Sequence, residues 1–407
     1  MTFPAYPEYK DSGVEWLGVV PMHWNVQKLK HIATIRNGRD HKEVEVDEGG
    51  YPVFGSGGEF TRASTYLHEG ESVLLGRKGT VDKPLYVTGR FWTVDTMFYT
   101  EVSRTADARY IYYYSTQFPF AQHSTNTALP SMAQEDLANL VIATPDLAEQ
   151  RQVSRFLDYE TARTDALIEE QKRLIELLKE KRQALVLSAR GKQGTVTTRL
   201  EHVAAQMARP VEQKEEEDYV PIGLYNRGRG LFHKEPRRKE DMGGSQFYWV
   251  RQGDLIISGQ FAWEGAIAMA GPEEEGCVVS HRYPIIRGVE GIARTEYIFA
   301  LLSTRHGDFL LNENSRGAAG RNRPLNIASL LKEKIWVPPM KDQETIGSIV
   351  REEEAIKDMV RLQQSILQER RSSLVFSAVT GKIDVCDWQE PKAAGAGAGS
   401  EPERAGA

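Results

Sequence analysis

The chain has 407 residues and a formal net charge of −6, a length that accommodates two or three domains with separate cores. A net negative charge argues against a protein that coats nucleic acid non-specifically, because such binding depends on overall positive charge. There is no apolar run of about 18 residues and no secretory signal, so we expect a cytoplasmic protein that does not enter a membrane.

The two cysteines, Cys277 and Cys386, lie far apart in sequence, and neither belongs to a CxxC motif. This excludes a disulfide framework and a thiolate zinc site. The histidines are scattered, without an HExxH pair, so we expect no bound metal.

The first part of the chain, residues 1–145, contains short β-strand patterns separated by glycine-rich turns. Strands are expected over residues 72–75, 85–88 and 91–94, and a helix over residues 110–117. This combination predicts a mixed α/β domain.

A long amphipathic helix is expected next, over about residues 149–188. This stretch contains neither glycine nor proline, and its apolar residues recur every three to four positions. Gly191 and Gly194 stand where the helix should end. Residues 146–191 are therefore predicted to be one spacer helix.

The second part of the chain, residues 192–339, resembles the first part in its pattern. Strands are expected over residues 255–258, 266–269 and 277–280, and a helix over residues 297–303. We expect a second mixed α/β domain.

A second long helix is expected over about residues 341–378, within the segment 340–384, and Gly381 ends it. Within the last segment, 385–407, the residues from about Pro391 to Ala407 are rich in Ala, Gly, Glu and Pro. Such a composition buries little apolar surface, so we expect a disordered tail.

The two halves of the chain are a duplication. The residues Leu137, Ile142, Pro145 and Gln150 recur 193 positions later as Leu330, Ile335, Pro338 and Gln343. At the far ends of the helices, residues 185–189 recur 189 positions later as residues 374–378. The second helix should therefore be shorter by about one turn. Gly70 to Gly76 resembles Gly253 to Gly259 more faintly.

The fold class expected is α+β, with two mixed α/β domains separated by two long helices in a pseudo-two-fold repeat. The helices should pack as an antiparallel coiled coil, although each could instead pack on its own domain. The predicted packing residues are Leu157, Leu167, Leu174, Leu178, Leu185, Ile349, Ile356, Val360, Leu367 and Leu374.

Signatures of catalysis are missing from the sequence. Pro338-Pro339 is preceded by Val337, whereas an amino-methyltransferase loop needs Asn or Asp there. The glycine-rich residues 54–58 and 76–80 lack the spacing of a cofactor or phosphate-binding loop. We therefore predict no catalytic residues.

Several turns carry side chains that suit contacts with DNA, since Arg, Lys and Thr bind phosphates or base edges. In the first half these are Arg77, Lys78, Thr80 and Lys83. The alternative is an ordinary solvated turn between two strands.

The second half offers further candidates. Residues 225–239 form a locally basic stretch, and glutamine and aromatic side chains can contact adenine and thymine. The candidates are Arg227, Arg229, Gln260, Phe261, Arg282, Arg321 and Arg323. The alternatives are that Phe261 and Trp263 are core residues, and that the arginines from Arg316 to Arg323 lie in an ordinary surface loop.

Five groups of residues resemble the specificity (S) subunit of type I restriction-modification systems, over almost the whole chain. They are residues 9–18 (YKDSGVEWLG), 51–58 (YPVFGSGG), 74–80 (LLGRKGT), 91–98 (FWTVDTMF), and the helix starts 149–151 (EQR) and 342–344 (DQE).

This resemblance implies two target-recognition domains that each read half of a bipartite site in double-stranded DNA. It also implies that the paired helices dock two methyltransferase (modification) subunits and that motor-nuclease (restriction) subunits join the complex. S-adenosylmethionine, ATP and magnesium would then belong to the partners, and this chain would hold no cofactor.

Two other classes of function are weighed against this one. An enzyme with recognition domains in the same chain predicts methyl transfer or cleavage without a partner. A coiled-coil adaptor predicts no sequence-dependent DNA binding at all.

Overall fold

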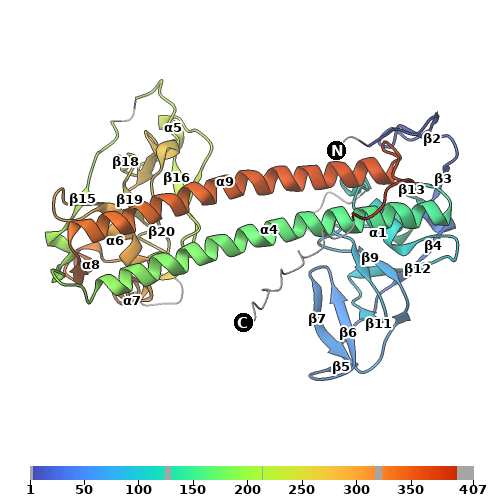
Figure 1. The fold of residues 1–407 in the computed structure, drawn as a ribbon, viewed down its shortest axis with the longest axis horizontal. Coiled ribbons are helices and arrows are strands. Elements are labelled where there is room, and N and C mark those ends of the chain that lie inside the picture. The colour runs from blue at the N-terminus through green and yellow to red at the C-terminus, as the bar shows by residue number, and fades with distance from the viewer. Residues whose placement is uncertain (1–2, 124–129, 213, 317–322, 392–407) are drawn as a thin grey trace, which may run out of the picture. The chain divides into compact units, whose positions relative to one another are not determined.

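The computed structural model describes residues 3–123, 130–212, 214–316 and 323–391 (Figure 1). The chain divides into two compact units, one of residues 1–168 and 364–407 and one of residues 169–363. Each unit therefore contains one globular region and part of both long helices. Within the described ranges, no helix is both long and apolar enough to cross a membrane.

The globular region of unit 1 is built around a four-stranded antiparallel sheet in the order β10-β9-β12-β4. Its strands are β4 (Ala33–Asn37), β9 (Ser72–Gly76), β10 (Leu85–Val87) and β12 (Met97–Val102). A second sheet has the order β5-β7-β6-β11-β8. It comprises β5 (Glu45–Val46), β6 (Tyr51–Gly55), β7 (Gly58–Ala63), β8 (His68–Glu69) and β11 (Arg90–Thr93).

The remaining elements of unit 1 surround these sheets. The strand pairs are β1 (Tyr9–Asp11) with β2 (Val19–Pro21), and β3 (Asn25–Lys28) with β13 (Val141–Thr144). The short helices are α1 (Ala108–Ser115), α2 (Phe120–His123) and α3 (Gln134–Asn139).

Unit 2 repeats the central sheet in the order β15-β22-β19-β20. Its strands are β15 (Ala204–Met207), β19 (Leu255–Ile257), β20 (Ile267–Met269) and β22 (Ile285–Gly288). The strand pairs are β14 (Val196–Arg199) with β23 (Lys334–Val337), β16 (Ile222–Leu224) with β17 (Leu231–His233), and β18 (Phe247–Trp249) with β21 (Val278–Ser280). The short helices are α5 (Lys239–Met242), α6 (Thr295–Leu302), α7 (Arg305–Glu313) and α8 (Ile327–Leu330).

The predicted duplication is confirmed strand by strand. The order β4-β12-β9-β10 of unit 1 corresponds to β15-β22-β19-β20 of unit 2, and β3 with β13 corresponds to β14 with β23. The two units differ in what is added: the five-stranded sheet belongs to unit 1, and β16-β17, β18-β21 and α5 belong to unit 2.

The long helices are α4 (Leu147–Ala189, 43 residues) and α9 (Met340–Val379, 40 residues). The difference of about one turn agrees with the prediction from the repeat. Within each unit the helices lie side by side and run in opposite directions (Figure 1). In unit 1, Asp165 is 3.7 Å from Arg371. In unit 2, Gln171 donates to Gln363 at 2.8 Å and Arg182 is 3.3 Å from Glu353.

The start of each long helix is tied to its own globular region by the repeated glutamine. The side-chain amide of Gln150 donates to the carbonyl of Pro145 and its oxygen accepts from the backbone N–H of Asp107, both at 2.9 Å. Gln343 donates to Pro338 and accepts from Arg294 N–H at the same 2.9 Å. Both glutamines are buried, which explains why they recur in the sequence.

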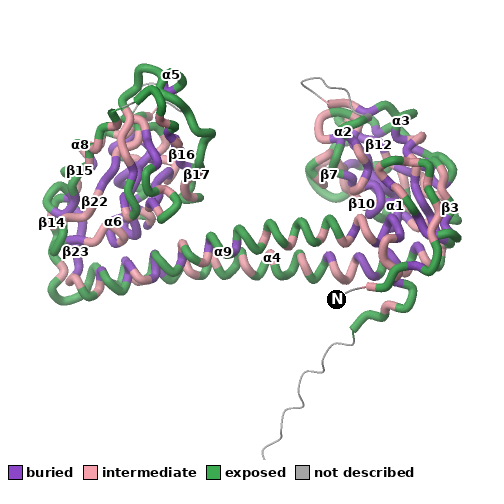
Figure 2. The backbone as a smooth tube through the Cα atoms, turned by 90° about the horizontal axis from the view of Figure 1, so that it is seen from above, coloured by how far each residue is buried: buried purple, intermediate pink, exposed green. Residues whose placement is uncertain are grey.

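Buried and half-buried residues recur along both helices (Figure 2), at spacings of three and four as in a coiled coil. On α4 these seam positions include Leu157, Thr161, Thr164 and Ile168 in unit 1, and Gln171, Ile175, Leu178, Arg182 and Leu185 in unit 2, all of them buried or half-buried. On α9 they include Glu353, Lys357 and Val360 in unit 2, and Leu367, Arg371 and Leu374 in unit 1, again buried or half-buried.

The predicted packing stripe is wrong at two positions. Leu167 and Leu174 are 43% and 45% exposed, and their neighbours Ile168 and Ile175 face inward instead. The apolar pattern of the sequence does not reveal the seam here, because polar Thr161, Gln171 and Arg182 occupy seam positions. The other predicted packing residues are buried or half-buried.

The predicted disordered tail is also corrected for its first residues. Val385 is 1% exposed, and the ring of Trp388 lies 5.4 Å from that of Phe156 on α4. The amide of Gln152 donates to the carbonyls of Val385 and Trp388 at 3.1 and 2.6 Å. The prediction rested on the Ala, Gly, Glu and Pro content of the chain end, and it therefore overlooked the apolar residues Val385 and Trp388 that precede this composition. Residues 392–407 lie outside the described residues.

We predict that Glu353→Gln destabilises the chain. Glu353 is fully buried and pairs with Arg182 at 3.3 Å and with Lys357 at 2.6 Å. Its loss leaves the buried Arg182 without its carboxylate partner and Lys357 with Glu354 alone. Breaking such a buried pair costs about 3–5 kcal/mol. Urea unfolding of the full chain measures the change.

Asp165→Asn is the control for this substitution, because it breaks the pair with Arg371 at an aspartate whose side chain is 63% exposed. An exposed pair contributes at most about 1 kcal/mol. Equal losses in the two variants would show that the Glu353 cluster has no special role in stability.

Candidate nucleic-acid interface

In unit 1, the turns at one edge of the two sheets converge on the β11–β12 turn. The backbone N–H of Arg39 donates to Thr93 O at 2.9 Å, and that of Arg77 donates to Thr96 O at 2.9 Å. Val94 N–H donates to Phe54 O at 3.1 Å. Turns that follow β4, β6 and β9 therefore meet here, although they are far apart in sequence.

The predicted residues of unit 1 lie on the turn that follows β9. Arg77 is half-buried, because its guanidinium donates to Asp95 O at 3.2 Å and lies 5.8 Å from the Phe98 ring. Lys78 and Lys83 are exposed, and within the described residues neither belongs to an ion pair. Thr80 is half-buried. The turn thus presents two exposed lysines, next to an arginine whose guanidinium is hydrogen-bonded within the domain.

Sequence reasoning missed Arg39 at this edge. Its side chain is exposed, and among the described residues it forms no ion pair. The signal was the Gly38-Arg39 pair directly after β4: a Cβ on Gly38 would lie 2.0 Å from Val94 O, so only glycine lets the turn approach so closely. Arg39 joins Arg77, Lys78 and Lys83 as a candidate contact.

In unit 2, the tip of the β16–β17 hairpin docks on the turn after β19. Arg227 N–H donates to Glu264 O and Gly228 N–H donates to Gly265 O, both at 2.8 Å. Arg227 has a φ of +59°, and both Arg227 and Arg229 are exposed. The guanidinium of Arg229 lies 5.3 Å from the Tyr225 ring. Docking therefore holds two arginines at the surface of the turn.

The turn itself, residues 259–265, contains Gln260, which is exposed, and Phe261, which is half-buried against the core cluster around Val250 and Ile256. The core alternative therefore fits Phe261 better than a DNA contact. Trp263 is half-buried, and the guanidinium of Arg323 lies 5.1 Å from its ring.

The other predicted arginines of unit 2 have different environments. Arg282 is exposed on the turn between β21 and β22, and its carbonyl accepts from Gly259 N–H at 2.7 Å. Arg323 is half-buried and donates to Ser315 O at 3.1 Å. Arg321 lies outside the described residues. The structure thus brings Arg227, Gln260 and Arg282 together around one turn.

Neither cysteine is an activated nucleophile. Burial raises the pKa of the Cys277 thiol, and burial together with Asp384 raises the pKa of Cys386 to about 12. Both thiols therefore stay protonated at neutral pH. Across the ranges that the structure describes, no group of His, Cys, Asp and Glu could hold a metal ion.

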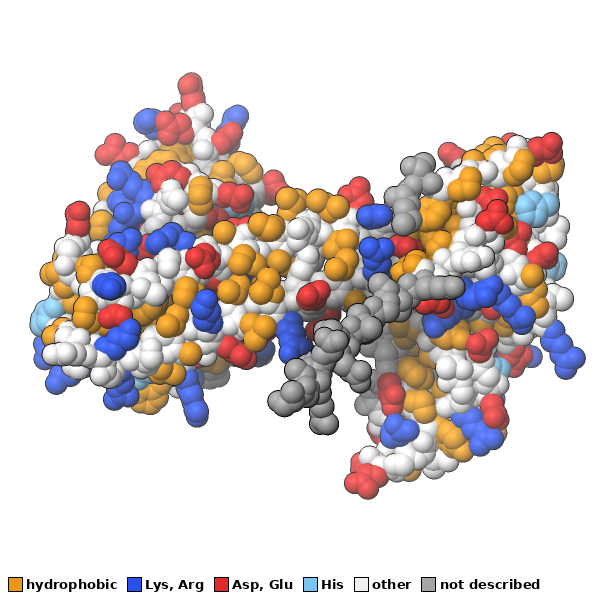
Figure 3. Space-filling model, in the orientation of Figure 1, with side chains coloured by type: hydrophobic (Ala, Val, Ile, Leu, Met, Phe, Trp, Pro, Cys, Tyr) orange, Lys and Arg blue, Asp and Glu red, His pale blue; other side chains and the backbone are white. Residues whose placement is uncertain are grey.

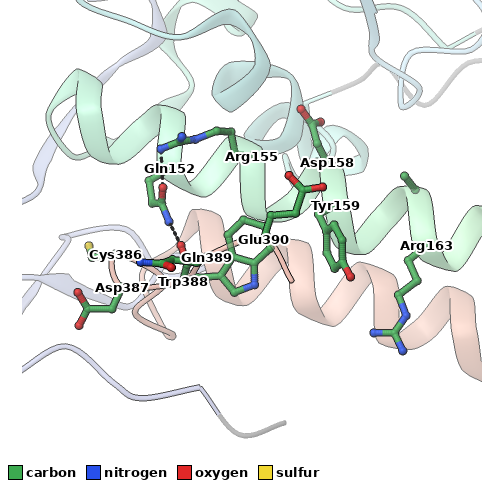
Figure 4. A pocket seen from close by; sticks show the side chains of 11 residues that line it. Gln152, Arg155, Asp158, Tyr159, Arg163, Cys386, Asp387, Trp388, Gln389 and Glu390 are labelled. Atoms are coloured by element: carbon green, nitrogen blue, oxygen red, sulfur yellow. Dashed lines mark hydrogen bonds between the residues drawn. The ribbon is translucent and has the colours of Figure 1, made fainter. Parts of the chain in front are cut away.

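A pocket of about 1000 Å³ lies in unit 1, between the start of α4 and the C-terminal segment (Figure 4). Its lining includes Arg155, Tyr159, Arg163 and Trp388. The close-up shows Gln152 bonded to the backbone of this segment, so the pocket borders the anchor of the chain end. We therefore place the candidate interface on the turns and not in this pocket.

Comparison with known proteins shows which family part of the chain resembles. The family described as "Type I restriction modification DNA specificity domain" matches residues 21–177. Residues 21–177 are therefore similar to the type I specificity domain. This match agrees, over residues 21–177, with the resemblance found in the sequence.

A curated protein similar to this chain is a putative type I restriction enzyme specificity subunit of Haemophilus influenzae. It is 25% identical over 160 residues, which cover 38% of this chain and 39% of the relative. The match therefore spans about two fifths of that protein's length.

One solved structure shows the same fold. The type I restriction-modification S subunit from M. genitalium matches with a TM-score of 0.53 at 14% identity, over 88% of this chain and 96% of that one. An HsdS subunit from Thermoanaerobacter tengcongensis matches with a TM-score of 0.41 at 14% identity, over 89% and 98%. The first of these confirms the predicted fold class.

We predict that Gly259→Ala destabilises unit 2 and displaces the turn that carries Gln260. A Cβ on Gly259 would lie 2.5 Å from Arg282 O, a backbone atom that cannot move aside easily. Such overpacking costs about 1–3 kcal/mol. Gly244→Ala is the control, since its Cβ would meet nothing within 4 Å. Thermal unfolding measures the melting temperatures of both variants. Equal melting temperatures would contradict the predicted destabilisation by Gly259→Ala.

Proposed function

We propose that this chain is the DNA-specificity subunit of a type I restriction-modification complex and reads a bipartite target in double-stranded DNA. The observation that carries the proposal is one four-stranded sheet built twice, with different exposed cations on the turns at its edge. Lys78 and Lys83 represent the first set and Arg227 and Arg282 the second. Different side chains on a repeated scaffold suit the reading of two different half-sites.

Under this proposal, the chain works in the cytoplasm and performs no chemistry itself. Methyl transfer and DNA cleavage belong to two methyltransferase subunits and to motor-nuclease subunits. S-adenosylmethionine, ATP and magnesium are then bound by those partners. The protonated thiols and the turn-borne cations of this chain fit a role in recognition.

An apolar flank of the helix pair supports docking of the methyltransferase subunits. In unit 2, Leu174, Leu177 and Met359 are 45%, 51% and 58% exposed, and each directly precedes a seam position, as does the half-buried Ile356. In an antiparallel pair, residues that precede seam positions share one side. We call these four residues the apolar flank.

The globular region of unit 2 does not cover the apolar flank. It contacts α9 through Arg361, whose guanidinium donates to Arg229 O at 2.8 Å, and Arg361 follows the seam position Val360, on the opposite side. Hydrophobic side chains gather on the visible surface of α4 and α9 (Figure 3). Contiguous exposed apolar groups of this kind mark protein interfaces.

The proposal is tested by the methylation pattern of the host genome, read base by base. We expect a bipartite methylated motif that disappears when this chain is deleted and returns when it is restored. A motif that survives the deletion would overturn the proposal. Methyl transfer by the purified chain alone would instead favour an enzyme.

We predict that Leu177→Glu with Met359→Glu prevents co-purification of the methyltransferase subunit, because a charged side chain would be desolvated at the interface. The control is Ile292→Glu, a 48% exposed apolar residue of unit 2 outside the helix pair. Circular dichroism checks that both variants fold. Normal assembly of the double variant would place the docking surface elsewhere.

A further inference from the structure

Unit 2 contains a pocket smaller than that of unit 1, and the charged residues in its lining are all cations. Its volume is about 320 Å³. Its lining residues are Pro221, Ile222, Lys234, Arg237, Met242, Ser245, Phe247, Ser280, Arg282 and Tyr283. They include three cations and not a single carboxylate, so a ligand in this pocket meets positive charge only.

The three cations have no carboxylate partner elsewhere in the described part of the chain. Lys234, Arg237 and Arg282 belong to no ion pair there. Their sequence neighbours differ: Arg238 is 3.4 Å from Asp218, and Lys239 is 3.7 Å from Glu215. The pocket therefore carries uncompensated positive charge, which raises the local concentration of anions.

The cations project from backbone that is firmly held. Arg237 and Tyr219 exchange backbone hydrogen bonds of 2.8 and 2.9 Å, and Lys234 N–H donates to Pro221 O at 2.9 Å. On the other wall, Arg282 O accepts from Gly259 at 2.7 Å. A ligand meets a largely preformed site, which lowers the entropic cost of binding.

The rest of the lining offers hydrogen-bond donors. Ser245 and Ser280 carry hydroxyls, and burial raises the pKa of Tyr283, so its phenol stays neutral. The lining contains no Asn, Gln, Asp or Glu, which are the side chains that read adenine or cytosine. A group with several acceptor oxygens and negative charge fits best, and a phosphodiester has both.

We propose that Lys234, Arg237 and Arg282 seat one backbone phosphate of the DNA at the half-site read by unit 2. This inference rests on the proposed function and deepens it. Arg282 is joined through its carbonyl to Gly259, at the start of the turn that carries Gln260. A phosphate held there sets the register of the duplex against a side chain that can read adenine.

The first test measures how DNA affinity depends on salt, using the full chain with its methyltransferase partner and a duplex that carries the host methylation motif. Arg237→Gln and Arg282→Gln are compared with Arg238→Gln, an adjacent arginine that is already paired with Asp218. Each lost phosphate contact reduces the slope of log K against log salt by about 1. We expect this reduction in the first two variants and an unchanged slope in the third.

The second test assigns the phosphate. Single phosphates of the duplex are replaced in turn by uncharged methylphosphonate. At one position in the second half-site, the replacement should weaken binding by the unmodified chain several-fold and have little further effect on Arg237→Gln. Such non-additivity shows that the arginine and the phosphate interact directly.

The outcomes separate this inference from the function on which it rests. If motif and non-motif duplexes bind equally, the proposed function fails. If the motif is recognised but Arg237→Gln, Arg282→Gln and Arg238→Gln have equal slopes, the pocket does not hold a phosphate. If Arg237→Gln relaxes selectivity at one base pair without changing the slope, the pocket reads a guanine instead, which also overturns the inference.

Discussion

The attachment of each long helix to its own sheet is the constraint on which the rest of the structure depends. Gln150 and Gln343 make equivalent pairs of hydrogen bonds in the first turn of α4 and α9. Tyr110 and Tyr297 add a second attachment, since their hydroxyls donate to Ala143 O on β13 and to Trp336 O on β23. These groups are buried, so each bond is costly to leave unmade.

Because this attachment is the same in both units, the surface beyond it can differ. The central sheet keeps one strand order, whereas the added strands, the turns and their cations are distinct. In a scaffold of this kind, the residues that stabilise the fold differ from the residues that contact a ligand. The buried amides and hydroxyls hold the fold, and exposed side chains such as Lys78 and Arg282 change what the surface binds.

The seam between the helices has a more polar character than the amphipathic pattern suggested. Arg182, Glu353 and Lys357 form a buried charge cluster in unit 2, while the Asp165–Arg371 pair in unit 1 is looser and more exposed. Burying polar groups in a seam costs stability but restricts which residues can face each other. One consequence is that leucines such as Leu174 and Leu177 remain outside, where a partner can bind them.

The sequence by itself determined the two long helices, the duplication and the mixed α/β class, because periodicity and repeated residues are properties of local order along the chain. Only the tertiary structure decided which side chains are free to act. It showed Ile175 inward and Leu174 outward, Phe261 against the core, and Trp388 anchored on α4. It also showed that Arg238 forms an ion pair, whereas Arg237 forms none with the residues that the structure describes. The physical reason is that burial and charge pairing depend on residues brought together from distant parts of the chain, and no local pattern specifies them.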